Sequence, residues 1–319
     1  MRRSMLVAPM IALSLFACSD DELAELGVVF NNLETLTAGT YEGWVIDQGG
    51  QPHSTGTFAL NANGQHSFAS PIDNPAMFVL TVEPPDDTDP APSDQKLLGG
   101  PFVNGTALLT ALGFVSVDAD ADFNTSPGTH VLLTPTTATA SDDDAGIWLL
   151  DPPEAGGAPT PAVVMPPLTA GWVYEGWVVY GPGTAMERAV SYGKITLEAD
   201  GTVSGRDSDA AGPLSGAPGD LMAGPPFSGG DFVMLNGTMF PAMPMLPFDF
   251  NGDDVTIGDS QWMHVISIEP AFDQGEDTLD AVPFLMKPFG DPFGDGGPTD
   301  TRTIQPLVPL PTGVVTLTN

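Results

Sequence analysis

One sequence motif occurs twice in this chain. Residues 36–45 have the sequence LTAGTYEGWV, and residues 168–178 have the sequence LTAGWVYEGWV, which carries one inserted residue. Two shorter segments recur in the same order, at residues 58–64 and 195–201 and at residues 80–84 and 266–270. Matches that keep one order indicate an internal duplication, so we expect two units that share a fold.

Glycine and proline interrupt the chain throughout, with 37 and 33 residues respectively. Between them lie short segments rich in Val, Ile, Phe, Trp and Thr, which favour strands. Asn63-Gly64 and Asp200-Gly201 are typical hairpin turns at equivalent positions of the two repeats. We therefore predict an all-β protein with two related β-sandwich-like (Ig-like) repeats and long loops rich in Gly, Pro and Asp.

The repeats and the composition also predict how the chain is divided. We expect a lipoprotein signal peptide at 1–17, an acidic tether at 18–35, a first β repeat at 36–151, a Pro/Gly-rich linker at 152–167 and a second β repeat at 168–319. The second repeat contains a long insertion at about residues 204–252. Residues 20–32 have modest helical character.

The first residues have the features of an export signal. Two arginines precede an apolar run at residues 5–16, which is too short to span a bilayer as a helix. The run leads into Ala17-Cys18, with the only cysteine of the chain, and is similar to a bacterial lipobox. This similarity implies acylation of Cys18 and a place at the outer membrane or cell surface, with the periplasmic face also open. The alternative is an ordinary secreted protein with an incidental cysteine.

The charge balance is strongly acidic. Asp and Glu number 41 against 8 Lys and Arg, which gives a formal net charge of −33. Nucleic acid binding requires cationic side chains that neutralise phosphates, so we expect no nucleic acid partner. We expect contact with the membrane only through the lipid anchor. Hydrophobic residues make up 42% of the chain, which is enough for a packed core.

The repeated segments follow a wider pattern. The first repeat has YEGWV at residues 41–45, a hairpin at 55–58 and FVLTVEP at 78–84, followed by a Pro-rich loop. The second repeat keeps residues 174–178 and 268–270. This pattern resembles the extracytoplasmic domain of anti-sigma factors of the anti-sigma-K type. The resemblance implies an extracytoplasmic β-sandwich module, doubled here.

The same resemblance marks a set of motif residues, which we expect to be structural. They are Tyr41, Glu42, Trp44, Glu83 and Pro84 in the first repeat and Tyr174, Glu175, Trp177, Glu269 and Pro270 in the second. Anti-sigma factors of this type carry a sigma-binding segment and a transmembrane helix before the domain. The sequence before the first motif contains neither, so we expect no direct contact with a sigma factor.

The motif residues allow more than one interpretation. We expect Trp44 and Trp177 to pack in the core or between sheets, and the alternative is an aromatic platform for a ligand. Paired carboxylates can act as acid and base in catalysis. Carboxylates that recur in both copies more often make structural hydrogen bonds. The four histidines are far apart in sequence, and no motif of a catalytic nucleophile or a nucleotide site is present, so we predict no enzyme.

Two acidic clusters suggest a calcium site. Aspartates at alternate positions would share one face of a strand, and alternating oxygen ligands also begin calcium loops. The candidate ligands are Asp118, Asp120 and Asp122, and Asp249, Asn251 and Asp253. Solvated acidic surface is the alternative that we favour, and we expect no other cofactor.

These observations lead to one expected function and two alternatives. We expect a non-catalytic, lipid-anchored module with a binding or envelope-associated role, whose partner is an envelope protein or a glycan. The first alternative is an extracytoplasmic signalling partner of an anti-sigma or sensor system. The second is an enzyme that uses acidic residues, such as a glycan hydrolase.

Overall fold

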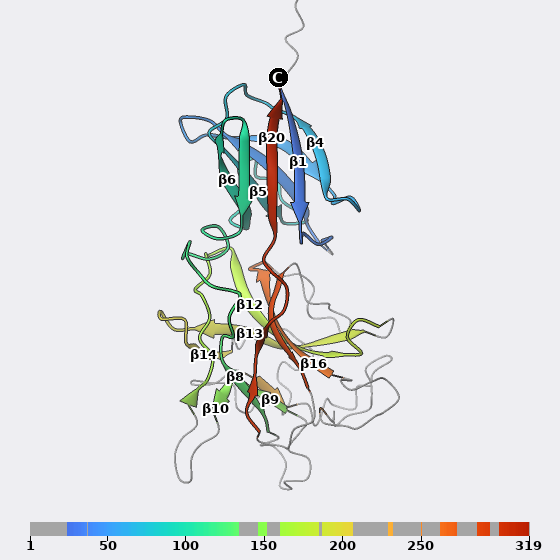
Figure 1. Ribbon diagram of the computed structural model, residues 1–319, viewed down its shortest axis with the longest axis vertical. Coiled ribbons are helices and arrows are strands. Elements are labelled where there is room, and N and C mark those ends of the chain that lie inside the picture. The colour runs from blue at the N-terminus through green and yellow to red at the C-terminus, as the bar shows by residue number, and fades with distance from the viewer. Residues whose placement is uncertain are drawn as a thin grey trace, which may run out of the picture.

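The computed structural model describes residues 24–36, 38–133, 146–151, 160–184, 187–206, 229–231, 250, 262–272, 286–293 and 300–318. These residues form strands, turns and bends, and none of them lies in a helix. The all-β prediction is therefore confirmed. The strands form two units that follow one another along the long axis of the molecule (Figure 1).

The strands divide between the two units as follows. The first unit contains β1 (Glu25–Asn31), β2 (Thr40–Ile46), β3 (Pro52–Phe58), β4 (Gln65–Ala69), β5 (Met77–Glu83), β6 (Lys96–Val103), β7 (Thr106–Thr110) and β20 (Thr312–Thr318). The second unit contains β8 (Thr129–Leu132), β9 (Gly146–Trp148), β10 (Leu150–Asp151), β11 (Thr160–Pro161), β12 (Trp172–Tyr180), β13 (Arg188–Leu197), β14 (Val203–Arg206), β15 (Gly229–Asp231), β16 (Trp262–Pro270), β17 (Met286–Pro292), β18 (Arg302–Thr303) and β19 (Gln305–Pro306).

The first unit is one curled antiparallel sheet with the strand order β3-β2-β5-β6-β7-β20-β1-β4. Alternate side chains point inward, so Leu26, Val28 and Phe30 of β1 are buried and the residues between them are exposed. The sheet curls until its edge strands meet, and the ring centroids of Phe58 in β3 and His66 in β4 lie 4.5 Å apart. Curling in this way encloses one face of the sheet as a core.

The second unit has two sheets around a core. The larger has the order β14-β13-β12-β16-β17-β19, the smaller has the order β15-β9-β8-β18, and β10 and β11 form a short pair. Tyr174 and Val178 of β12 belong to the same buried cluster as Leu132 of β8 and Ile147 of β9. The two sheets therefore pack face to face, as in a sandwich.

The repeated motifs occupy equivalent positions in the two units. Gly43 of β2 pairs with Gly56 of β3, and Gly176 of β12 pairs with Gly193 of β13. In both pairs the register shifts directly after the first glycine. The strands β2 and β12 each have a second antiparallel neighbour, β5 and β16, which carry the recurring Glu-Pro segment. The duplication in the sequence thus corresponds to a duplication of strand pairing.

The two units are nested in the chain. The sequence assigns residues 168–319 to the second repeat, but residues 312–318 form β20, which lies between β1 and β7 in the first unit. The second unit is therefore inserted between β7 and β20. The physical reason is that the backbone groups of β1 and β7 along this gap need hydrogen-bond partners, and an alternating strand from any part of the chain can supply them.

The segment before the first motif also differs from its prediction. The sequence predicts an acidic tether at 18–35 with modest helical character at 20–32, but residues 25–31 form β1. This strand pairs with β4 on one side and β20 on the other. Its apolar residues alternate with a period of two, which suits a half-buried strand better than a helix. The acidic residues at the start of this segment suggest a tether, and they make the alternation of its apolar residues hard to recognise.

The predicted linker also contributes to a core. Within residues 152–167, Val163 is fully buried and Met165 is 1% exposed. The Trp172 indole donates to the Lys96 carbonyl of the first unit at 3.1 Å. The Thr169 amide donates at 2.8 Å to the carbonyl of Val115, in the segment that connects β7 to β8. The buried cluster is continuous from one unit to the other. The units are therefore packed together as well as connected.

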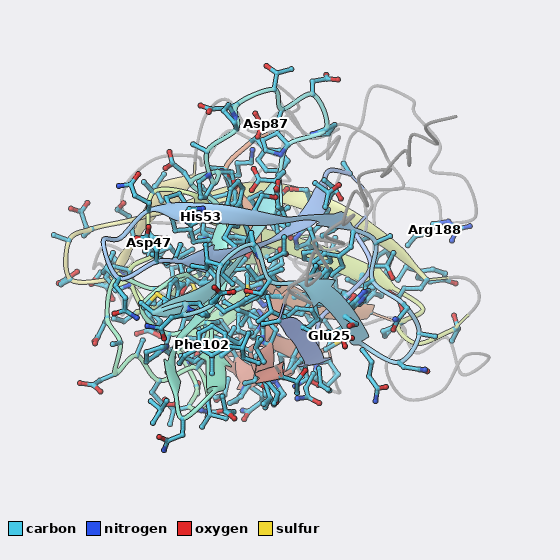
Figure 2. The ribbon with its side chains drawn as sticks, turned by 90° about the horizontal axis from the view of Figure 1, so that it is seen from above. Glu25, Asp47, His53, Asp87, Phe102 and Arg188 are labelled. Carbon is cyan, nitrogen blue, oxygen red and sulfur yellow. The ribbon has the colours of Figure 1, made fainter. Side chains whose placement is uncertain are left out.

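Both ends of the described chain lie at one end of the molecule. Glu25 at the start of β1 pairs with Thr318 at the end of β20, at the end of the first unit that points away from the second unit (Figure 1). Figure 2 shows the molecule from above, looking toward this end. Glu25 lies here at the start of β1, and the loop that carries Asp87 projects outward.

Candidate functional site

The motif of the first unit forms a chain of side-chain hydrogen bonds. The Trp44 indole, 3% exposed, donates to Thr81 Oγ1 at 2.9 Å, and the Thr81 hydroxyl donates to the Glu83 carboxylate. Glu42, two residues before Trp44, accepts a hydrogen bond from Ser54 of β3. These groups therefore join β2 to both neighbouring strands.

The second unit repeats this arrangement with a different set of residues. The Trp177 indole, 2% exposed, donates to Ser267 Oγ at 2.8 Å, as Trp44 does to Thr81. Glu175 accepts a hydrogen bond from Ser191 of β13, as Glu42 does from Ser54. In both units the serine oxygen also accepts from a glycine amide, at 2.9 Å and 3.0 Å. The equivalence extends to single atoms, which indicates that the motif holds the sheet together.

The electrostatics of Glu83 follow from its burial. Its side chain is 3% exposed, and its Oε2 atom is buried without a hydrogen-bond partner. Burial raises the pKa of this carboxyl above its usual range, and the hydrogen bonds from Thr81 and the Ser93 amide act in the opposite direction. The Ser93 amide lies 3.3 Å from Oε1, so the loop after β5 folds back over this carboxylate.

The other motif residues also have structural positions. The Tyr41 hydroxyl donates to the Glu34 carbonyl at 2.7 Å, and the Tyr174 hydroxyl donates to the Pro166 carbonyl at 2.8 Å. Burial raises the pKa of both phenols. Glu269 is 3% exposed and pairs with Val173, just as Glu83 pairs with Thr40. Pro84 follows β5 and Pro270 ends β16, while Cys18 lies outside the described residues.

A buried polar cluster in the second unit was not predicted from the sequence. His130 of β8 and His264 of β16 are both fully buried, with ring centroids 4.9 Å apart. The Tyr192 hydroxyl lies 2.9 Å from His264 Nε2, and His130 Nε2 lies 3.3 Å from Asp291 Oδ2. The Nδ1 atoms of both histidines are buried without a hydrogen-bond partner. The cluster joins the two sheets of the second unit.

The environment of this cluster favours neutral imidazoles. Burial, and then the charge of Arg302, lower the pKa of His130 to about 3. Burial, and then His130, lower the pKa of His264 well below its usual range. Burial raises the pKa of Asp291 to about 6, against the opposing effect of Arg302. The histidines stand 134 positions apart in sequence, and no local signal connects them.

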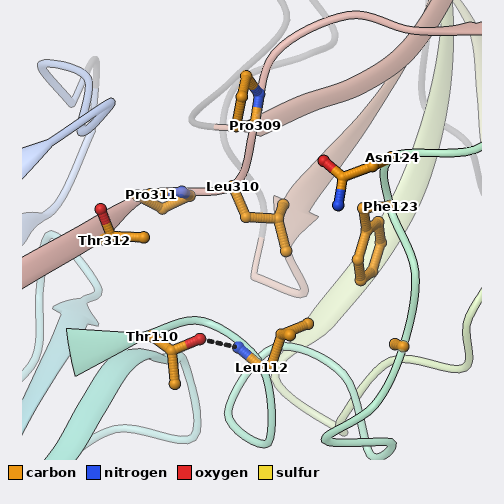
Figure 3. A pocket seen from close by; sticks show the side chains of 9 residues that line it. Thr110, Leu112, Phe123, Asn124, Pro309, Leu310, Pro311 and Thr312 are labelled. Atoms are coloured by element: carbon orange, nitrogen blue, oxygen red, sulfur yellow. Dashed lines mark hydrogen bonds between the residues drawn. The ribbon is translucent and has the colours of Figure 1, made fainter. Parts of the chain in front are cut away.

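A pocket of about 170 Å³ lies where the two units meet (Figure 3). Leu112 and Phe123 line it from the segment after β7, and Leu310 faces them from the segment before β20. The full lining is Thr110, Leu112, Ala121, Phe123, Asn124, Pro309, Leu310, Pro311 and Thr312. None of these side chains is an acid, a base or a thiol, so the pocket is better suited to binding a small apolar group than to catalysis.

The acidic clusters have the following positions. Asp118, Asp120 and Asp122 lie in the loop between β7 and β8, not on a strand. Asp118 accepts from the Asp120 amide at 2.9 Å, and Asp122 accepts from the Asn124 amide at 2.7 Å, so these carboxylates support turns. Among the described residues, no three His, Cys, Asp or Glu side chains are placed to share a metal ion. The other candidate ligands, Asp249, Asn251 and Asp253, lie outside the described residues.

Comparison with known proteins identifies one part of the chain. Residues 4–96 match the family model described as anti-sigma-K factor rskA, C-terminal. This range ends at the first residue of β6, so it contains β1 to β5 and the motif of the first unit. The predicted resemblance is thereby confirmed for this range. No curated protein and no solved structure matches the chain. Across the residues that the structure describes, no helix is long and apolar enough to cross a membrane.

Proposed function

From the anti-sigma factor domain at residues 4–96, we propose that this protein is a lipid-anchored, non-catalytic module of the cell envelope. The observation that carries the proposal is the place where the chain enters the first unit. Glu25 lies beside Thr318, at the end of the molecule away from the second unit (Figure 1). Glu25 is seven positions after Cys18, a distance of at most about 25 Å when extended. A lipid on Cys18 therefore holds the first unit near the membrane and directs the second unit outward.

The chemistry of the motif supports a role without catalysis. Glu42 and Glu175 accept hydrogen bonds from serines of neighbouring strands, and Glu83 is covered by the loop after its own strand. The junction pocket contains no titratable side chain. Carboxylates that make hydrogen bonds within the sheet are poor candidates for the acid and the base in the hydrolysis of a glycan. A binding role for an envelope protein or a glycan fits this arrangement better.

The anchor is tested by the change Cys18→Ser. We expect the wild-type protein to partition into a detergent phase and the variant into the aqueous phase, because a stable lipid anchor provides the membrane affinity. Ser19→Ala serves as the control, since it changes a neighbouring residue and keeps the thiol. Equal partitioning of wild type and Cys18→Ser would contradict the proposal.

The family match favours a second candidate, an extracytoplasmic signalling partner of an anti-sigma or sensor system. In this role the second unit binds the periplasmic part of a sensor. Deletion of the gene would then change transcripts that depend on an extracytoplasmic sigma factor. We expect wild type to restore them and Cys18→Ser to fail, because the sensor is held at the membrane. An unchanged transcript profile after deletion would exclude this candidate and leave the binding role.

A further inference from the structure

The strand β20 fills a gap in the first unit that the rest of that unit leaves open. It pairs with β1 from Asn31↔Thr312 to Glu25↔Thr318 and with β7 from Thr110↔Thr312 to Thr106↔Thr316. It is the last strand of the chain, and residues 307–311 connect it to β19. We call the gap between β1 and β7 the strand slot.

The second unit has the same slot, filled from a different part of the chain. The Met165 amide donates to the Gly201 carbonyl at 2.9 Å, as the Phe30 amide of β1 donates to the Gly64 carbonyl at 2.8 Å. The segment that contains Met165 thus takes the place of β1. On one side, β8 pairs with β18. On the opposite side, Gly128 directly before β8 bridges to Val163, and the end of β8 pairs with β9. β8 therefore lies between this segment and β18, where β20 lies in the first unit.

The two slots are filled from opposite directions in the sequence. β8 precedes the repeat that it completes, whereas β20 follows the repeat that it completes by about 200 residues. The slot therefore needs a strand but not a particular chain connection. An unfilled slot would expose the backbone groups of two edges, and such edges take up strands from other sources.

The strand and its surroundings carry little charge. Residues 312–318, TGVVTLT, contain no charged side chain. On the outer face, Val314 stands between Val29 of β1 and Leu108 of β7, which are 40% and 70% exposed. On the inner face, Val315 is fully buried. Two copies with a net charge of −33 repel each other over most of their surfaces, but this strand adds nothing to that repulsion.

We propose that the strand slot of one copy accepts β20 of a second copy, which gives a strand-exchanged dimer. The connection to β20 is short, and Pro309 and Pro311 restrict its backbone. Short connections of this kind favour exchange of a terminal element between copies. The exchanged strand makes the same hydrogen bonds and buries the same Val315 side chain as in one chain. The proposal does not depend on the lipid anchor.

Two full-length chains with different tags test the exchange, each with Cys18→Ser. One carries Val29→Cys and the other Val314→Cys, which are direct partners across β1 and β20. Both positions face outward, so both variants retain the core. After joint refolding and mild oxidation, we expect disulfide-linked heterodimers, because the two thiols meet only when β20 crosses between copies. Val29→Cys with Val103→Cys is the control, since Val103 is 64% exposed on β6, which does not pair with β1.

The two pairings decide the outcome. We expect at least about tenfold more heterodimer from the Val29–Val314 pair than from the control, because only that pair brings the two thiols within disulfide distance. Insertion of six Gly and Ser residues after Leu310 should reduce this yield several-fold, because a longer connection lets β20 return to its own chain. Equal yields from both pairings, or no heterodimer from either, would overturn the proposal. An unchanged yield after the insertion would also overturn it.

Discussion

At the scale of single residues, the glycine of each Glu-Gly-Trp motif lies beneath an aromatic ring. A Cβ atom on Gly176 would lie 1.8 Å from Cζ of Tyr192. One on Gly43 would lie 2.5 Å from Thr55 Oγ1 and 3.0 Å from Cζ of Phe78. Both rings are fully buried, and the Tyr192 hydroxyl reaches His264. The glycine is thus needed because the ring occupies the space of a side chain. In the second unit this contact also positions a member of the histidine cluster.

We expect Gly176→Ala to destabilise the protein by about 2–3 kcal/mol, because the added methyl group overpacks the core against Tyr192. Gly27→Ala is the matched control, since Gly27 also lies in a strand and the nearest atom to its new Cβ would be 3.9 Å away. Urea unfolding of both variants measures the difference. If Gly176→Ala lowers the free energy of unfolding no more than Gly27→Ala does, the Tyr192 ring moves aside at little cost.

At the scale of elements, the histidine cluster joins strands that the sequence keeps far apart. His130 comes from β8 in the smaller sheet, while His264, Tyr192 and Asp291 come from the larger sheet. Arg302 of β18 completes the charged surroundings. Buried neutral imidazoles without full hydrogen bonding make the contact between the sheets sensitive to protons. The sandwich of the second unit should therefore respond to pH more than the first unit.

We expect stability to fall between pH 7 and pH 5. An unfolded histidine takes up a proton near pH 6.5, but folded His130 does so only near pH 3, so acid favours the unfolded chain. This loss is about 2 kcal/mol for His130 between pH 6.5 and pH 5, and His264 acts in the same direction. Asp291 opposes it, because its raised pKa of about 6 lets the folded state bind a proton first.

The opposing contributions can be separated by substitution. Asp291→Asn removes the opposing group, so its urea midpoint should fall more steeply than that of wild type between pH 6 and pH 5. His53→Gln is the control, because His53 lies in the first unit next to Asp47, outside the cluster (Figure 2). The same pH slope in all three proteins would mean that the histidine cluster does not control acid stability.

At the scale of the whole molecule, charge and shape act together. The net charge of −33 is spread over two units that are joined at one junction. At that junction Lys287 lies 3.5 Å from Glu34, an ion pair between the second unit and the first. A strongly acidic surface keeps a protein soluble and keeps it apart from anionic neighbours. The stability of the folded state therefore depends on ionic strength, because the negative charges of one compact chain repel one another.

We expect the melting temperature to rise with sodium chloride, because the Debye length falls from about 30 Å at 0.01 M to about 3 Å at 1 M salt. Calcium should add little beyond magnesium at matched ionic strength, because solvated acid responds to screening alone. A calcium-selective increase that Asp120→Asn or Asp253→Asn abolishes would instead establish a metal site. A melting temperature that falls with sodium chloride would contradict the argument from self-repulsion.

The sequence by itself determined the features that depend on local patterns. Repeated motifs, strand-forming segments and Asn-Gly or Asp-Gly turns predicted an all-β chain with an internal duplication, because hydrophobic period and turn chemistry act over a few residues. The motif around Trp44 also carried the family resemblance, which residues 4–96 confirm. Trp44 and Trp177, for which packing is predicted, are 3% and 2% exposed.

Only the tertiary structure decided how distant segments meet. The placement of β20 beside β1, the strand at residues 25–31 and the contact between His130 and His264 depend on which sheet edges remain open once the local hairpins have formed. An unpaired edge accepts any strand of suitable pattern, so the sequence of β20 does not specify its partner. Long-range pairing is chosen by the packing of the whole chain, and no local pattern contains that choice.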